Sequence, residues 1–272
     1  MEKKFILITG ATDGIGKQAA LELAGENHKI ILHGRSEEKL ESVIDEIRGI
    51  ITNADLDSIV FDLASQSAIR KGADKLKLLY DRLDIVINNA GTFKKERELT
   101  EDNIEYTFAV NHLAPFLLTH ELIPLLEKSD SAQIINVSSM AHQSASLDFD
   151  NLQGEKEYSG YSAYALSKLG NLIFTYELAE KLSQKNIRVN ALHPGVINTK
   201  LLRESFGGGG SSLQKGAETI VYLADSDEVE NRTGKYFVSK KEKKSSSLSR
   251  DEKLRKKFWR LSEELTGINN YI

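Results

Sequence analysis

The chain has 272 residues, of which 40% are hydrophobic, and its 40 Asp and Glu against 36 Lys and Arg give a formal net charge of −4. This length suits one large domain or two small ones with a sizeable core, and the negative charge argues against a nucleic-acid partner. The absence of cysteine excludes disulfides, thiolate metal sites and a cysteine nucleophile. It also fits a reducing compartment, so we expect a cytoplasmic protein.

The N-terminal apolar run is short. Phe5, Ile6, Leu7 and Ile8 are followed closely by Gly10. A signal peptide has a longer apolar stretch before its cleavage site, and a membrane-spanning helix needs about 20 apolar residues. We therefore expect neither a leader nor a transmembrane segment.

Short apolar runs alternate along the chain with stretches of helical periodicity. The candidate strands are residues 5–9, 29–33, 58–61, 85–88, 133–137, 188–193 and 235–238. The candidate helices lie near residues 15–25, 37–48, 66–80, 101–127, 162–184 and 215–224. This alternation predicts βαβ units, and strands that are apolar throughout indicate helices on both faces of the sheet. We predict an α/β fold, a single domain over residues 1–272 with a Rossmann-type doubly wound parallel sheet of about seven strands.

A glycine-rich turn lies between the first candidate strand and the first candidate helix. Residues 9–16 read T-G-A-T-D-G-I-G, and glycine lets a backbone turn tightly and approach a pyrophosphate closely. Free N–H groups and the helix dipole at the start of a helix also favour an anion. The turn therefore predicts a dinucleotide site, with contacts from Gly10, Thr12, Asp13, Gly14, Ile15 and Gly16.

The end of the second candidate strand indicates which dinucleotide binds. A ribose with a free 2′-hydroxyl is usually held by a carboxylate at this place, whereas this chain has Gly34 and then Arg35. A guanidinium matches the charge and geometry of a 2′-phosphate, so we expect NADP(H) rather than NAD(H). Asp62 and Leu63 follow the third strand, where Asp62 can contact the adenine, cap the next helix, or do both.

A tyrosine and a lysine share one face of a predicted helix, since Tyr164 and Lys168 are four residues apart. A free tyrosine has a pKa of about 10, and an ammonium about 4 Å away at an effective dielectric of ~20 contributes roughly 4 kcal/mol, or about three pKa units. We therefore expect Tyr164 to exchange a proton near neutral pH. A second Tyr-x-x-x-Lys, from Tyr236 to Lys240, leaves a strand and has no shared helical face. Tyr161 lies ~10 Å along the helix from Lys168, too far for this coupling.

Polar or glycine residues end the remaining strands, at the sheet edge where ligands bind in such folds. Ser138 and Ser139 follow the fifth strand, where a serine hydroxyl can hydrogen-bond a substrate oxygen or simply form a turn. The other members are Asn88, Asn89, Ala90 and Gly91 after the fourth strand and His193, Pro194, Gly195 and Thr199 after the sixth. One shared site explains these strand ends more economically than six separate structural reasons.

Other kinds of catalytic site lack their characteristic residues. The six histidines show no metal-ligand spacing, and the chain has no Gly-x-Ser-x-Gly elbow of a serine hydrolase. We therefore predict no metal cofactor.

Together, these residues resemble the short-chain dehydrogenase/reductase family over essentially the whole chain. Residues 9–16 match the cofactor turn of that family and residues 88–91 match its N-N-A-G motif. Asn111 matches its helix asparagine, and residues 194–199 match its P-G-x-x-x-T motif.

The resemblance implies a role for each matching residue. Tyr164 is the acid/base, and Ser139, as the second serine of its pair, orients the substrate carbonyl. Lys168 binds the nicotinamide ribose and lowers the pKa of the tyrosine, and Asn111 supports a proton-relay water. The implied cofactor contacts outside the glycine turn are Arg35, Asp62, Leu63, Asn89, Ala90, Gly91, Tyr164, Lys168, Pro194, Gly195, Val196 and Thr199.

One departure from the common pattern concerns the interval between Ser139 and Tyr164, which is longer than is usual in the family. The stretch 148–156 fills it, and this insertion looks like the retinol-dehydrogenase branch, as do residues 14–17. Members of that branch act on retinoids, steroids or other lipophilic carbonyls, and many are membrane-anchored. The resemblance therefore implies an NADP(H)-dependent oxidoreductase that acts on a lipophilic carbonyl or alcohol.

Two other functions use the same scaffold. One is a non-catalytic NADP(H) sensor that binds a partner, although a sensor need not retain Asn111, Ser139, Tyr164 and Lys168. The other is an epimerase or dehydratase, whose members usually carry a longer C-terminal substrate domain. We expect a small-molecule substrate and a homo-oligomer, either a dimer or a tetramer.

Two segments differ in composition from the rest of the chain. Residues 200–216 include four consecutive glycines and are expected to form a flexible substrate loop, either a tolerated surface loop or a mobile lid. Residues 239–272 form a basic extension. Within it, Leu254, Phe258, Leu261 and Leu265 recur on one helical face. We predict a docked helix after a solvated charge run in a Ser-rich loop, the alternative being a membrane-surface helix.

Overall fold

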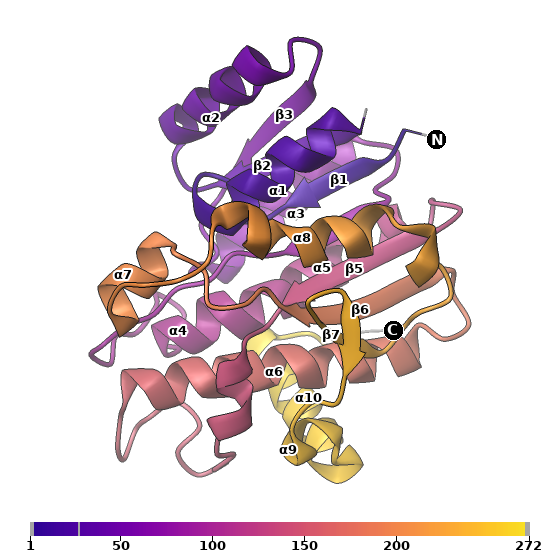
Figure 1. Ribbon diagram of the computed structural model, residues 1–272. Coiled ribbons are helices and arrows are strands. Elements are labelled where there is room, and N and C mark those ends of the chain that lie inside the picture. Colours follow the sequence, from indigo (N-terminus) through magenta and orange to yellow (C-terminus); the bar gives the residue numbers. More distant parts are fainter. Residues whose placement is uncertain (1–2, 27, 270–272) are drawn as a thin grey trace.

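The computed structural model describes residues 3–26 and 28–269 and contains one central sheet (Figure 1). The strands run in the order β3-β2-β1-β4-β5-β6-β7-β8 across the sheet. They are β1 (Phe5–Ile8), β2 (Lys29–Gly34), β3 (Asp55–Val60), β4 (Ile85–Asn88), β5 (Ala132–Val137), β6 (Ile187–His193), β7 (Lys235–Val238) and β8 (Lys241–Lys243). All neighbouring pairs are parallel except β7 and β8. The predicted doubly wound sheet is confirmed, with one strand more than expected.

Helices cover both faces of the sheet, and each face has its own apolar core. The cluster on one face joins the sheet to α1, α2 and α8, and the cluster on the other joins it to α3, α5 and α6. The helical elements are α1 (Gly14–Gly25), α2 (Glu37–Ile50), α3 (Gln66–Leu79), α4 (Tyr106–Phe108), η1 (Ala109–Leu113), α5 (Ala114–Leu126), η2 (Met140–Ser144), α6 (Gly160–Lys181), α7 (Lys200–Phe206), α8 (Leu213–Asp225), η3 (Asp227–Val229), α9 (Ser247–Arg250) and α10 (Glu252–Thr266). Apolar strands are therefore buried on both sides, as the sequence pattern predicts.

Strand β3 begins three residues before its predicted start at Ser58. It pairs with β2 from Asp55 onward, opposite Lys29. Lys29 Nζ lies 3.0 Å from Asp55 and 2.8 Å from Asp57, so two polar residues that argue against a buried strand form ion pairs at the sheet edge. Strand pairing decides the boundary here and outweighs local residue preference.

The helix predicted from residue 101 begins five residues later, with α4 at Tyr106. Glu105 prevents an earlier start because its carboxylate accepts hydrogen bonds from Thr107 N (2.9 Å) and Phe108 N (2.6 Å), as an N-cap does. The chain before it turns through Asn103, whose φ is 59°. After α4, the π-helical turn η1 widens the helix before α5 begins.

The C-terminal segment docks on the domain as predicted, although two details differ. Residues 241–243 form strand β8, antiparallel to β7, where we expected an irregular Ser-rich loop; their side chains remain exposed, as expected of a solvated charge run. In α10, the buried face also includes Trp259, which is not one of the four residues of the predicted stripe. It is 4% exposed, and its ring lies 4.8 Å from that of Phe116 on α5. Phe258, 1% exposed, is buried beside it, so both aromatic rings face the domain.

Residues 200–216 comprise three parts: helix α7, a loop that contains the four consecutive glycines, and the start of α8. Their mobility stays a prediction. In the described part of the chain, no helix combines the length and the apolar composition that crossing a bilayer requires.

Candidate active site

A cavity of about 740 Å³ opens at the carboxyl edge of the sheet. Residues that follow β1, β2, β3, β4, β5 and β6 all contribute to its walls, together with α6 and α7. The site residues predicted from the sequence that line it are Gly10, Thr12, Asp13, Gly14, Ile15, Arg35, Asp62, Leu63, Asn89, Ala90, Gly91, Ser139, Tyr164, Lys168, Pro194, Gly195, Val196 and Thr199. Gly16 and Asn111 lie behind this lining.

The glycine turn needs its glycines for two different reasons. Gly10 and Gly14 have φ values of 66° and 59°, a conformation that other residues rarely adopt. Gly16 is required by close packing, because a Cβ there would lie 2.4 Å from the Gly10 carbonyl oxygen. Asp13 caps α1 by accepting from Gly14 N at 2.7 Å. The turn thus presents the start of α1 to the cavity, as anion binding requires.

Arg35 stands where β2 ends, at the rim of the cavity. Its Nη1 donates to the Tyr106 hydroxyl at 3.1 Å, and Lys39 on the first turns of α2 lines the same part of the cavity. Asp62 lines the cavity but does not cap α3. That helix is capped by Ser65, whose hydroxyl accepts from Ala68 N at 3.2 Å, so the capping interpretation of Asp62 is wrong.

Tyr164 is buried in α6 and lines the cavity together with Ser139. Burial raises the pKa of Tyr164 to about 12, although a hydrogen bond with the Ser139 side chain acts to lower it. The expected lowering of this pKa toward neutral by Lys168 is therefore not found. Desolvation of the buried hydroxyl is the largest cause of the shift, and it outweighs the hydrogen bond with Ser139.

Lys168 is a buried, positively charged residue in the lining of the cavity. It is 3% exposed, and burial lowers its pKa to about 8. Its Nζ donates to the Val137 carbonyl oxygen at 3.1 Å, which fixes the ammonium at the end of β5. A Cβ placed on Gly91 would lie 3.4 Å from this Nζ, so the turn after β4 passes directly beside it.

The two serines after β5 face different surroundings. Ser138 Oγ donates to the Lys168 carbonyl oxygen at 2.8 Å, and this side chain is 2% exposed. Ser139 Oγ accepts from Ala141 N at 3.2 Å and starts η2, beside Tyr164. The first serine thus fastens α6 to the sheet, and the second is placed to meet a molecule in the cavity.

Asn111 lies in the π-helical turn η1 and does not line the cavity. Its Oδ1 accepts from Thr92 N at 2.7 Å, and its Nδ2 donates to Thr92 O at 2.9 Å and to Ser167 Oγ at 3.0 Å. These bonds tie the loop after β4 to α6. π-helical turns are rare and often occur at functional sites, and sequence periodicity does not reveal them.

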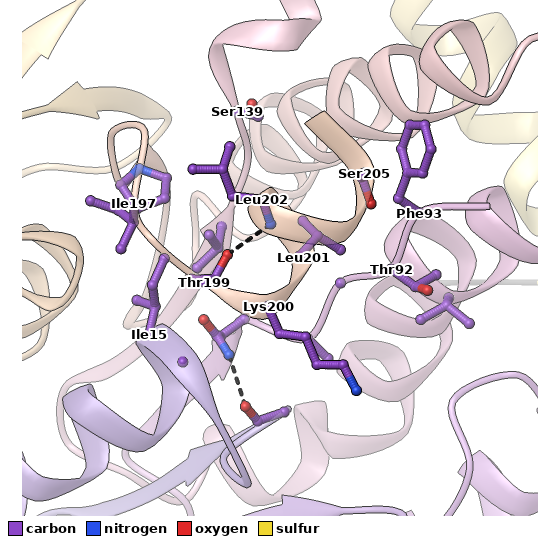
Figure 2. Close-up of a pocket in the computed structure, with 18 of the residues that line it drawn as sticks. Ile15, Thr92, Phe93, Ser139, Ile197, Thr199, Lys200, Leu201, Leu202 and Ser205 are labelled. Carbon is purple, nitrogen blue, oxygen red and sulfur yellow. Dashed lines mark hydrogen bonds between the residues drawn. The ribbon is translucent and has the colours of Figure 1, made fainter. Parts of the chain in front are cut away.

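Three aromatic side chains surround Tyr164 and form what we call the aromatic wall: Phe93, Tyr161 and Phe206. The Phe206 ring centroid lies 4.8 Å from that of Phe93, 5.5 Å from that of Tyr164 and 6.2 Å from that of Tyr161. Figure 2 shows α7 across the cavity, with Leu201, Leu202 and Ser205 on the helix and Phe93 beyond it. Thr199 positions this helix as its N-cap, since its hydroxyl accepts from Leu202 N at 3.2 Å.

Sequence reasoning missed Lys39, Phe93, Tyr106 and Phe206 as lining residues. No motif marks them. Phe93, Tyr106 and Phe206 reach the cavity from a loop and two short helices whose positions depend on tertiary packing, whereas Lys39 lies in the first turn of α2. The sequence gives one indication for Phe206, which immediately precedes the four glycines of the predicted substrate loop. Among residues 3–26 and 28–269, no group of three or more His, Cys, Asp or Glu could hold a metal ion.

Comparisons with known proteins agree with this geometry. A family model described as short chain dehydrogenase matches residues 4–207. Human retinol dehydrogenase 13 is 40% identical over 281 residues, which cover 97% of this chain and 85% of the relative. Human retinol dehydrogenase 12 is 37% identical, with 97% and 87% covered.

Solved structures give the same result. A Mycobacterium paratuberculosis protein superposes with a TM-score of 0.82 at 28% identity, covering 97% of this chain and 93% of that one. A protein of the short chain dehydrogenase class from Escherichia coli CFT073, solved in complex with NADPH, superposes with a TM-score of 0.74 at 28% identity, covering 89% and 98%. This chain belongs to the short chain dehydrogenase family and is an oxidoreductase that acts on CH–OH or carbonyl groups.

Proposed function

We propose that the chain is an NADP(H)-dependent oxidoreductase in which Tyr164 is the acid/base and the substrate is a lipophilic carbonyl or its alcohol. The observation that carries this proposal is that Tyr164, Ser139 and Lys168 lie together in the lining of the same cavity as the glycine turn. The relatives named retinol dehydrogenase support the lipophilic substrate.

The residues of the cavity fit a nicotinamide dinucleotide. The start of α1 is open to the cavity, and Gly10, Gly14 and Gly16 leave no side chain between the backbone and a pyrophosphate. Arg35 and Lys39 place two cations at the rim where β2 ends, and none of the lining residues at the end of β2 or at the start of α2 is a carboxylate. Asp62, which follows the neighbouring strand β3, also lines the cavity. The two cations favour a 2′-phosphate, and the neighbour solved with NADPH supports the same choice.

The protonation states of the free site suit carbonyl reduction. The pKa of Tyr164 at about 12 keeps the phenol protonated at neutral pH, so it can give its proton to a carbonyl oxygen as the bond order of that carbonyl falls. Ser139 can donate a hydrogen bond to the same oxygen and stabilise its developing negative charge. When bound, the cofactor supplies or accepts the hydride.

Lys168 contributes a positive charge that water does not screen. At neutral pH its ammonium is protonated, since its pKa of about 8 still lies above 7. A cation in this position stabilises a tyrosinate after proton transfer, and we assign it the contact with the nicotinamide ribose. Asn111 acts from behind the lining by fixing Thr92 and Ser167; its support of a relay water stays a prediction.

The aromatic wall supports an apolar substrate. Phe93 and Phe206 pack against the Tyr164 ring, Tyr161 packs against Phe206, and Leu201 and Leu202 extend this apolar surface along α7. A conjugated or aromatic carbonyl compound can pack against these rings while its oxygen reaches Tyr164 and Ser139.

The experiment that tests the function is a turnover assay with NADPH or NADH and a panel of retinal, aliphatic aldehydes, ketones and quinones. We expect oxidation of NADPH with lipophilic carbonyls. Tight NADPH binding without turnover of any compound would favour the non-catalytic sensor.

The choice of cofactor is tested by a binding titration. Arg35→Ala should weaken NADPH binding by roughly 10- to 100-fold, the loss of one or two charge-assisted hydrogen bonds, and leave NADH binding nearly unchanged. Equal affinity of the wild type for both cofactors would refute the NADP(H) assignment.

A further inference from the structure

The backbone carbonyl of Ser139 is held by a histidine three residues further along. His142 Nδ1 lies 2.6 Å from Ser139 O, and the His142 backbone N–H donates to the same oxygen at 3.2 Å. A carbonyl oxygen only accepts hydrogen bonds, so Nδ1 carries the ring proton. One residue thus closes the turn that begins at Ser139 with two hydrogen bonds.

The other nitrogen of the same ring contacts the C-terminal extension. The Ser246 backbone N–H donates to His142 Nε2 at 3.2 Å. A backbone N–H only donates, so Nε2 must be the unprotonated nitrogen, and the two contacts require the same neutral tautomer. The ring is 0% exposed and packs edge-on against Tyr236, with centroids 5.2 Å apart. Burial lowers the pKa of His142, which keeps the ring neutral at pH 7 even though its bond to Ser139 acts in the opposite direction.

Ser246 is itself fixed in place by a network of hydroxyl groups. It caps the short helix α9, where its hydroxyl accepts from Ser249 N at 3.4 Å. Ser249 Oγ donates to Ser245 Oγ at 2.7 Å, and Tyr176 of α6 lies 2.7 Å from the same Ser245 oxygen. The chain around Ser246 is therefore bound to α6, the helix that carries Tyr164.

We propose that His142 is a positioning residue, which fixes the backbone of Ser139 and makes residues 245–250 of the C-terminal extension part of the support of the active site. The chain of contacts runs from Ser139 O through the His142 ring to Ser246 N. This inference rests on the proposed function, since it gives Ser139 a role in turnover. Neither His142 nor Ser246 lines the cavity, so they act through Ser139 alone.

The first test compares two substitutions of His142, each of which can replace one of the two ring nitrogens. In His142→Asn, the side-chain amide can replace Nδ1 and donate to Ser139 O, whereas in His142→Gln the amide oxygen replaces Nε2 and accepts from Ser246 N. With NADPH and retinal, we expect His142→Gln to lower kcat by about tenfold or more, the cost of misplacing a reacting group, with the Kd for NADPH unchanged. His142→Asn, which keeps the bond to Ser139 O and loses the one from Ser246 N, should lower kcat by a smaller factor of about threefold, a difference below 1 kcal/mol. Equal kcat values for His142→Gln and the wild type would overturn the proposal.

The second test removes the donor on the other side of the ring. Ser246 has φ −57°, a value that proline adopts. Ser246→Pro removes the N–H and places the proline Cδ against His142 Nε2, so it breaks this contact and displaces the imidazole. Ser246→Ala is the matched control, because it loses the same hydroxyl cap and retains the N–H. We expect a lower kcat for Ser246→Pro than for Ser246→Ala, with equal NADPH binding. Equal kcat values for the two variants would show that the C-terminal extension does not support the active site. This pair decides the proposal if the His142 variants do not fold. A wild-type protein that binds NADPH but reduces no carbonyl would refute the proposed function instead.

Discussion

Helices α6 and α7 both line the cavity, but they are held in opposite ways. In α6, 16 of 22 residues are buried, among them Tyr164 and Lys168. In α7, none of the seven residues is buried, and a Cβ added to Gly207, Gly208 or Gly209 just after it would meet open space. One helix is fixed by packing along most of its length, and the other rests on the cavity through a few side chains.

If the proposed function is correct, this difference separates the chemistry from the choice of substrate. A proton donor must keep its position to a fraction of an ångström, because small displacements cost large factors in rate. A surface that selects substrates by apolar contact tolerates movement and needs to open for entry and exit. We therefore expect substitutions in α6 to change kcat and those in α7 to change KM.

The largest effect is expected from Tyr164→Phe, a substitution in the tightly packed helix α6. The variant removes the transferable proton and almost no volume, so kcat should fall by about 10³-fold or more while NADPH binding is retained. Steady-state turnover and a binding titration measure the two quantities.

Tyr236→Phe is the matched control, because Tyr236 is also buried but does not line the cavity, and phenylalanine keeps the ring that packs against His142. Its kcat should equal that of the wild type. If Tyr164→Phe remained active and Tyr236→Phe did not, the acid/base assignment would be wrong.

The glycine turn and helix α6 are also the parts of the site that could be predicted from the sequence. The glycine turn and the Tyr164 to Lys168 spacing lie within single elements, so helical geometry and the order of strand and helix suffice to place them. Seven of the eight strands follow from local apolar runs in the same way, although pairing with β2 extends β3 beyond its apolar run. Strand β8 could not be predicted, since it is a charged segment that becomes a strand only by pairing with β7.

Tertiary contacts determine the remaining features. Asn111 lies in a π-helical turn, and Phe206 reaches Tyr164 from a short helix whose position depends on the Thr199 cap. The pKa of Tyr164 also depends on the tertiary environment, because burial of its hydroxyl raises it. The expected effect of the Lys168 charge assumed a separation of about 4 Å at an effective dielectric of ~20, and it left out the cost of burying the hydroxyl, which dominates in the folded protein.

A second prediction concerns the cost of keeping Lys168 charged in the protein interior. Its pKa in the folded state, about 8, lies below that of the unfolded chain, about 10.4. Below pH 8 the residue is protonated in both states, so the full cost of burying the charge is present. Between these two pKa values the unfolded chain binds more protons, and the free energy of unfolding should rise with pH by about 3 kcal/mol in total.

Lys168→Met should therefore be inactive yet more stable than the wild type at pH 7. The Val137 carbonyl keeps a hydrogen bond from Asn171 Nδ2 at 3.3 Å, so the substitution does not leave it unpaired. Thermal denaturation at pH 7 and pH 10 measures the effect, with the exposed Lys241→Met as the control for a lost charge. The stabilisation should shrink at pH 10; a gain that does not depend on pH would contradict the assignment of a buried ammonium.

The smallest effect is expected from Phe206→Ala, which tests the loosely held side. Phe206 is 40% exposed and contacts Phe93, Tyr161 and Tyr164 only through ring packing. Its loss removes roughly 1–2 kcal/mol of apolar contact to a substrate bound against the aromatic wall. The KM for retinal should rise by about tenfold, with kcat within about threefold of the wild type, because the contact exists in the ground state and the transition state alike.

A small hydrophilic aldehyde provides the internal control, since it has no apolar body to pack against Phe206, and its KM should not change. Leu78→Ala, which removes a hydrophobic side chain that is 88% exposed on α3 outside the cavity, controls for surface effects. A Phe206→Ala variant that lost kcat for both substrates would show that α7 helps to position Tyr164. The separation of chemistry in α6 from substrate choice in α7 would then fail, because the ring contact at 5.5 Å between Phe206 and Tyr164 would be supporting the proton donor itself.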